Sequence, residues 1–142
     1  MIFKRLNRTL GEQVFIVMQA NVAGIAADDV VCLETAAASV DGIKINQGAT
    51  AIVANSCVVG VADAAIANGS YGLVQIYGPR STSRIFTSNT SQAAGVGLAA
   101  VSAQDYLSGV ATTANVLQWA VLLESETTQT TTTSKKIFLR MM

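Results

Sequence analysis

Short apolar runs rich in β-branched residues are the feature that most constrains this chain. Residues 13–19 read Gln-Val-Phe-Ile-Val-Met-Gln, and residues 30–34 read Val-Val-Cys-Leu-Glu. Each run has the length of a strand and is bounded by polar residues, whereas a helix that crosses a membrane needs about 20 apolar residues. The chain is therefore predicted to be all-β, with little helix and with no membrane as a partner.

Alternation and turn residues extend this pattern along the chain. Apolar and polar residues alternate over 43–47, directly after the hairpin-type pair Asp41-Gly42. Pro79 is expected to end the strand before it, because proline has no N–H to donate. The threonine-rich segment 124–134 is interpreted as a loop. The other predicted strands span residues 57–62, 72–78, 83–87, 95–102, 105–110, 117–123 and 135–142.

Side-chain size and alternation predict which residues form the core. Trp119 alternates with Leu117 and Val121 on one face of its strand, so Trp119 is expected to be buried. The expected core residues are Phe15, Val17, Val59, Val61, Leu73, Trp119, Val121 and Phe138.

Several kinds of chemistry are disfavoured by the composition. The chain has no His, which excludes Ser-His-Asp and Cys-His catalysis and removes the commonest metal ligand, so no enzyme, metal or cofactor is expected. Residues 95–100 match G-x-G-x-x-A, but a polar loop precedes them and no βαβ pattern surrounds them. Asp28-Asp29 fits a turn better than a calcium site. Cys32 and Cys57 lie in apolar surroundings and are interpreted as free thiols, with a bridge as the alternative.

Charge is sparse and unevenly placed. Only 13% of residues are charged and the net charge is zero, which suits a protein that ends in an assembly. Both ends of the chain are basic while the rest is acidic, with no basic face for nucleic acid. The ends are interpreted equally as docking segments for an acidic surface or as sheet edges protected by lysine. The candidate interface residues are Lys4, Arg5, Arg8, Lys135, Lys136 and Arg140.

Three segments taken in order, residues 12–17, 30–34 and 59–78, resemble small capsid decoration (cement) proteins of tailed bacteriophages. The ending is similar to their closing hairpin: Trp119-Ala-Val-Leu-Leu-Glu, a threonine-rich loop, then Lys-Lys-Ile-Phe-Leu-Arg over 135–140. The resemblance implies a compact antiparallel sandwich or small barrel, β-tulip-like, that trimerises on the outer surface of the mature capsid. It also implies binding to the major capsid protein, which strengthens the shell against internal DNA pressure.

The expected organisation is a basic N-terminal arm over residues 1–11 and a single β domain over 12–142, closed by the C-terminal hairpin. The arm is expected to be extended and to contact a neighbouring subunit, either the capsid protein or another copy of this chain. The protein would be made in the host cytoplasm and act on the virion. The alternatives are another virion β module, such as a tail or fibre domain, and a small-ligand-binding β-barrel.

Overall fold

The protein is all-β in the part of the chain that the structure describes. The structure is a computed structural model that describes residues 11–21, 24–35, 42–47, 57–87, 91–101, 104–109, 117–127 and 131–141. Its eleven elements are all strands, and they are hydrogen-bonded into one sheet. Within these ranges there is no helix with the length and apolar character needed to span a bilayer. The all-β prediction is confirmed.

Five strands close into a small barrel, because β1 pairs with β3 on one side and with β5 on the other. The interior is filled by aliphatic side chains contributed by every strand of the barrel. The strands, in sheet order, are β1 (Val14–Ala20), β3 (Lys44–Gln47), β2 (Val30–Leu33), β4 (Val58–Ala62) and β5 (Tyr71–Arg80). The fully or nearly buried interior residues are Met18, Ala20, Ile25, Val31, Ile45, Ala62, Ile66 and Val74.

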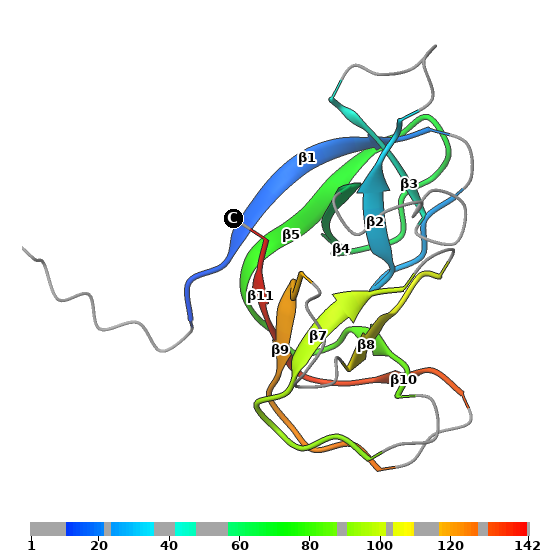
Figure 1. Cartoon of the computed structure of the whole chain (residues 1–142). Coiled ribbons are helices and arrows are strands. Elements are labelled where there is room, and N and C mark those ends of the chain that lie inside the picture. Colours follow the sequence, from blue (N-terminus) through cyan, green and yellow to red (C-terminus); the bar gives the residue numbers. More distant parts are fainter. Residues whose placement is uncertain are drawn as a thin grey trace, which may run out of the picture.

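The remaining strands form a second layer that continues from β5 (Figure 1). Its strands are, in sheet order, β11 (Ile137–Arg140), β9 (Ala120–Leu122), β7 (Gly97–Ala100), β8 (Leu107–Gly109), β6 (Arg84–Ile85) and β10 (Thr133–Ser134). A second core joins side chains of β2 and β4 to those of this layer, including Cys32, Val61, Leu98, Leu122 and Leu139. The barrel therefore uses the outer side of β2 and β4 to pack on the second layer, while the outer side of β1 and β5 is left for other contacts.

The predicted core is only partly correct, because Val59 and Trp119 pack against the cores while other predicted residues lie on the opposite face of their strands. Val61 is fully buried, but Val17 is 60% exposed and Leu73 is 47% exposed, and the other five predicted core residues are only partly buried. Their neighbours in the chain fill the cores instead: Met18 beside Val17, Val74 beside Leu73, and Leu122 beside Val121. Because side chains alternate across a strand, a shift of one residue moves the whole set to the opposite face.

Strand β5 does not end at Pro79, as the sequence predicted, but continues to Arg80. Pro79 lies opposite Phe138 of β11, and its carbonyl accepts a hydrogen bond from Gln13 Nε2 at 2.6 Å. Gly78 before it has φ of +100°, and a Cβ there would lie 2.0 Å from the Glu12 carbonyl oxygen. Glycine at this position lets the incoming chain cross β5 directly, which sets where β1 begins.

Two smaller expectations have clear outcomes. The threonine-rich segment is not a simple loop, because its end forms β10, which pairs with β6. The turn interpretation of the Asp28-Asp29 pair is confirmed: Asp28 has φ of +68°, and Asp29 accepts a hydrogen bond from the Ala26 N–H just before β2.

Candidate interaction surface

A row of large apolar side chains lies on the outside of the protein across β1, β5, β11 and β9. Their neighbours along each strand belong to the two cores, so these side chains point the other way. Strand pairing brings them side by side: Val17 lies opposite Leu73, and Phe138 lies opposite Val121. We call this row the outer face, and it consists of Phe15, Val17, Tyr71, Leu73, Tyr77, Val121 and Phe138.

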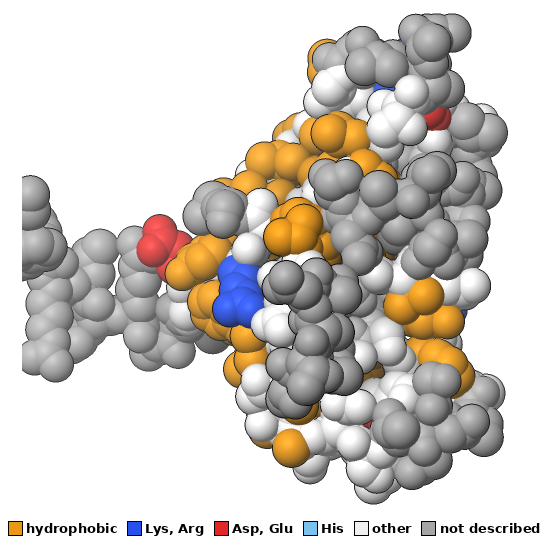
Figure 2. Space-filling view, viewed as in Figure 1, with side chains coloured by type: hydrophobic (Ala, Val, Ile, Leu, Met, Phe, Trp, Pro, Cys, Tyr) orange, Lys and Arg blue, Asp and Glu red, His pale blue; other side chains and the backbone are white. Residues whose placement is uncertain are grey.

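The outer face is exposed most strongly at its β1–β5 end. Tyr71 is 62% exposed, comparable with Val17. Figure 2 shows hydrophobic side chains gathered over β1 and β5 on this side of the molecule. Contiguous exposed apolar surface is common where a protein binds another macromolecule, so the outer face is the candidate interaction surface.

At the other end the outer face is ordered by aromatic packing. The rings of Tyr77 and Phe138 meet edge to face with centroids 5.3 Å apart. Such pairs add about 0.5–1.5 kcal/mol beyond the area they bury. The ring pair joins the barrel to the second layer and holds this end of the outer face in one geometry.

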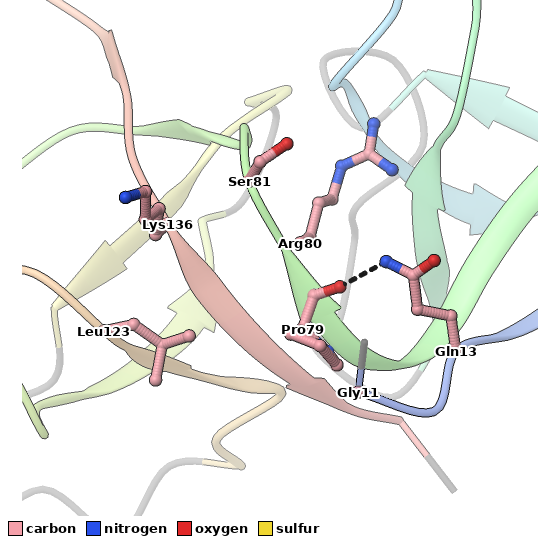
Figure 3. Close-up of a pocket in the computed structure, with 7 residues that line it drawn as sticks. All are labelled: Gly11, Gln13, Pro79, Arg80, Ser81, Leu123 and Lys136. Carbon is pink, nitrogen blue, oxygen red and sulfur yellow. Dashed lines mark hydrogen bonds between the residues drawn. The ribbon is translucent and has the colours of Figure 1, made fainter. Parts of the chain in front are cut away.

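A pocket of about 340 Å³ opens where the chain crosses β5 (Figure 3). Its apolar wall is formed by Pro79 and Leu123, and its polar groups include Ser81 and Lys136. A smaller pocket of about 140 Å³ lies beside it and shares Arg80 with it. The larger pocket combines an apolar wall with the exposed cation Lys136, which fits a segment that carries both an aliphatic and an acidic side chain.

The predicted basic residues fall into three groups. Lys4, Arg5 and Arg8 lie outside the described residues. Lys135 forms an ion pair with the buried Glu126, with Nζ and Oε2 2.7 Å apart. Lys136 and Arg140 are both exposed and lie on β11 or directly before it.

Arg140 is anchored by a neutral partner and so keeps its charge available to a further contact. Its Nη2 donates to Gln118 Oε1 at 2.8 Å, and a Cβ on Gly97 would lie 2.2 Å from that same oxygen. Gly97 therefore makes room for the Gln118 side chain, which in turn orients Arg140. Gly11, the first described residue after the basic N-terminal segment, lines the same pocket as Lys136. The fold thus brings Gly11 and the basic residue Lys136 before β11 to one pocket.

Two arginine sites, at Arg80 and Arg84, were not predicted from the sequence. Arg80 is 6% exposed, and its guanidinium binds Asp28 at 2.6 Å and Asp63 at 3.2 Å. It also donates to the Ala62 carbonyl and to Gln75 Oε1. These contacts hold the end of β5 against the turn before β2. Arg80 and Asp28 are fifty-two residues apart, and no local sequence pattern predicts that they pair.

Arg84 joins the second layer to the barrel. Its Nη1 lies 2.9 Å from Oδ1 of the fully buried Asp29 and also contacts Asp105, while Gln47 Nε2 donates to both carboxylates. Burial alone would lower the pKa of the Arg84 guanidinium, but the hydrogen bonds and charges of Asp29 and Asp105 outweigh burial and raise that pKa. Four of the acids are therefore engaged by Arg80 and Arg84, so they do not form an acidic outer surface.

Cys32 and Cys57 are both free thiols, as predicted. Cys32 is buried in the core between the two layers, and this burial, with Cys57 beside it, raises the pKa of the Cys32 thiol. In the described ranges, no cluster of three or more His, Cys, Asp or Glu is placed to hold a metal ion. Residues 95–100 lead into strand β7 rather than into a helix, so the glycine pattern lacks the context of a dinucleotide site.

Comparison with known proteins places the fold. No protein-family model and no curated protein sequence matches this chain. Among solved structures, it is similar to the head fibre gp8.5 N base of bacteriophage phi29, with a TM-score of 0.54 and 13% sequence identity. The match covers 92% of this chain and 96% of the other. At this identity the similarity establishes a shared fold over nearly the whole length.

Proposed function

We propose that this chain is a structural virion protein of a tailed bacteriophage that binds the outer surface of the capsid. In this role it associates as a homotrimer, contacts the major capsid protein and stabilises the shell against internal DNA pressure. The interaction is non-covalent: apolar surface loses water against the shell, and basic residues pair with acids there. No catalysis or cofactor is part of this function.

The observation that carries the proposal is the outer face. On β1 and β5 large apolar side chains lie outward as well as inward: Val17 and Leu73 are exposed, while their neighbours Met18 and Val74 are buried in the barrel. In a monomer in water, polar side chains at the outward positions would be more favourable than apolar ones. Lys136 and Arg140 lie beside the outer face without a carboxylate partner within 4 Å among the described residues, so they supply charge for an acidic partner.

The shared fold supports a virion role and also favours a second candidate. The similar structure is described as the base of a head fibre, so this chain could serve as the base module of a fibre. Both candidates place the protein on the virion, and both use the outer face for attachment. They differ in whether a further fibre is carried outward from the attached domain.

A ligand-binding barrel is less well supported. The barrel interior is occupied by its own side chains, and Val31, Ile45 and Val74 have no exposed surface. The pockets of the described residues lie on the outside, next to the outer face. Their position suits contact with a partner protein.

The proposal is tested by mixing the purified protein with phage shells that lack it and pelleting the shells. We expect the protein to pellet with mature shells and to raise the temperature at which they release DNA. The matched control uses a variant with Leu73→Asp and Val17→Asp, which charges the outer face without touching the cores. If the wild-type chain and this variant pellet equally, the outer face has no role, and if neither pellets the capsid proposal fails.

A further inference from the structure

One border of β1 carries backbone groups that the barrel does not use. The Ala20 N–H donates to the Ser70 carbonyl at 3.0 Å, on the β5 side. The Gln19 N–H donates to the Ile43 carbonyl at 3.0 Å, on the opposite side toward β3. Because the direction alternates along a strand, the even residues of β1 point to β5 and the odd residues point to the β3 side.

The same alternation directs the N–H groups of Phe15 and Val17 away from β5. The register between β1 and β5 is regular from Phe15 to Gln19, so no bulge breaks the alternation. β3 is parallel to β1 and its first partner is Gln19, so it runs away from Phe15 and Val17. Among the described residues nothing accepts these two N–H groups, and Figure 1 shows this half of β1 along the outer border of the barrel.

An unpaired border next to exposed apolar side chains is a template for an added strand. Val17 is 60% exposed and stands at this border, so an incoming strand would satisfy its backbone and cover its side chain together. The border is short, with two N–H groups, separated by one residue, that no described residue accepts. It fits a single extended segment of about five residues.

The chain's own N-terminal segment starts on the wrong side to fill this border. Gly11 lies against the Pro79 ring, and the Glu12 carbonyl lies against Gly78, so the chain enters β1 from across β5. Gly11 also shares a pocket with Lys136 near β11. Gly11 therefore lies on the side away from the open border, and ten extended residues preceding it would reach up to about 33 Å from that point.

We propose that residues 1–10 of a second copy of this chain add as a strand along the Phe15–Val17 border of β1. In each copy Gly11, from which the donor segment would extend, lies at one side of the β1–β5 pair and the open border lies at the other. Such a head-to-tail contact closes into a ring when the rotation allows. This inference rests on the self-association in the proposed function, and it names the contact that produces it.

Two variants separate donor from acceptor. Deletion of residues 1–10 removes the donor segment. Val17→Pro removes the outward N–H, which no barrel hydrogen bond uses, and proline is tolerated on an open border. We expect each variant alone to be monomeric by light scattering, and Val17→Thr, which keeps the N–H and nearly the same shape, to assemble like the wild-type chain.

Mixing the variants gives the decisive result. The deletion variant keeps the border and the Val17→Pro variant keeps the donor segment, so an equimolar mixture should form a one-to-one complex that neither forms alone. If Val17→Pro assembles like the wild type, if Val17→Thr also fails, or if the mixture stays monomeric, the proposal is overturned. Monomeric variants that still pellet with shells would leave the capsid function standing.

Amide hydrogen exchange tests the same contact without relying on a variant that folds. In the full chain the amides of Phe15 and Val17 should exchange at least tenfold more slowly than in the deletion variant. The amides of Ile16 and Met18, which face β5, should be protected in both. Unprotected Phe15 and Val17 in the full chain, or protection only when shells are added, would overturn pairing with a second copy.

Discussion

The placement of leucine side chains gives the sharpest test of which residues form the core. Leu73 on β5 was a predicted core residue but is 47% exposed on the outer face, whereas Leu122 on β9 is fully buried between the two layers. Replacing each by alanine is the same chemical change at two positions. The difference between the two variants therefore reports on burial alone.

The expected magnitudes follow from that burial. Leu122→Ala removes a fully buried side chain and leaves a cavity, which costs about 2–5 kcal/mol of unfolding free energy. Full burial of a leucine contributes about 1.5–3 kcal/mol, and about half of Leu73 is already in water, so Leu73→Ala should cost about 1 kcal/mol or less. The solution stability of the monomer at low concentration is the relevant quantity, because self-association would bury the outer face.

Urea unfolding followed by far-UV circular dichroism measures both costs, and shell pelleting supplies the second readout. We expect Leu73→Ala to weaken pelleting while Leu122→Ala, where still folded, pellets normally. A Leu73→Ala cost equal to that of Leu122→Ala would show that the face described as outer is a core. It would refute the reasoning that assigns it to an interface.

Three further predictions address the interior and the basic end. Arg84→Met should lower the free energy of unfolding, measured in urea, by about 3 kcal/mol. This is the lower end for a broken buried pair, because Asp29 keeps other donors. Arg84→Lys should cost less, and a cost of Arg84→Met below about 1 kcal/mol would contradict the pairing. Burial raises the pKa of the Cys32 thiol, so the folded protein favours the neutral thiol. The contribution of this preference to folding stability is complete below the pKa of the unfolded thiol, about 8.5, and is lost as pH rises above it. Stability should then fall by up to about 1.4 kcal/mol per pH unit relative to Cys32→Ala, and parallel pH profiles of the two proteins would rule this out. Deleting residues 1–8 should leave a folded domain that binds shells more weakly at low salt, by about 0.2–1 kcal/mol for each of three cations. The difference should vanish at high salt. Equal binding at low salt would show that the arm has no role in attachment.

Strand positions could be predicted from this sequence because they depend on local composition. Runs such as residues 13–19 and 30–34 are short, apolar and bounded, and both coincide with strands of the barrel. The weaker glycine- and alanine-rich segments 95–102 and 105–110 also contain strands, β7 and β8. Local chain stiffness and turn residues are enough to set these positions.

Which face of each strand is buried could not be predicted in the same way. In Phe-Ile-Val-Met over 15–18 every residue is apolar, so alternation does not distinguish the faces. Large size does not distinguish the faces either, because Met18 lies in the barrel core while Phe15 and Val17 lie outside. The predicted core therefore included residues of the outer face, such as Val17 and Leu73.

Contacts between residues far apart in the chain could not be predicted from the sequence either. The Arg80 and Arg84 sites depend on turns and strands that meet only in the folded chain, and Asp28 and Arg80 are fifty-two residues apart. The basic ends were recognised as a candidate interface, yet only the fold shows that Lys136 shares a pocket with Gly11. Proximity of this kind follows from sheet order, which local patterns do not encode.

Cryo-electron microscopy of shells decorated with the purified chain tests the central claim most directly. The account predicts density for this fold on the outside of the capsid, with the outer face over β1, β5, β11 and β9 covered by capsid protein or by a second copy. Val17 and Leu73 should then be buried, and Lys136 and Arg140 should lie near acidic side chains of the partner. Density in which the outer face points to solvent, or shells that carry no density for this chain, would contradict the account.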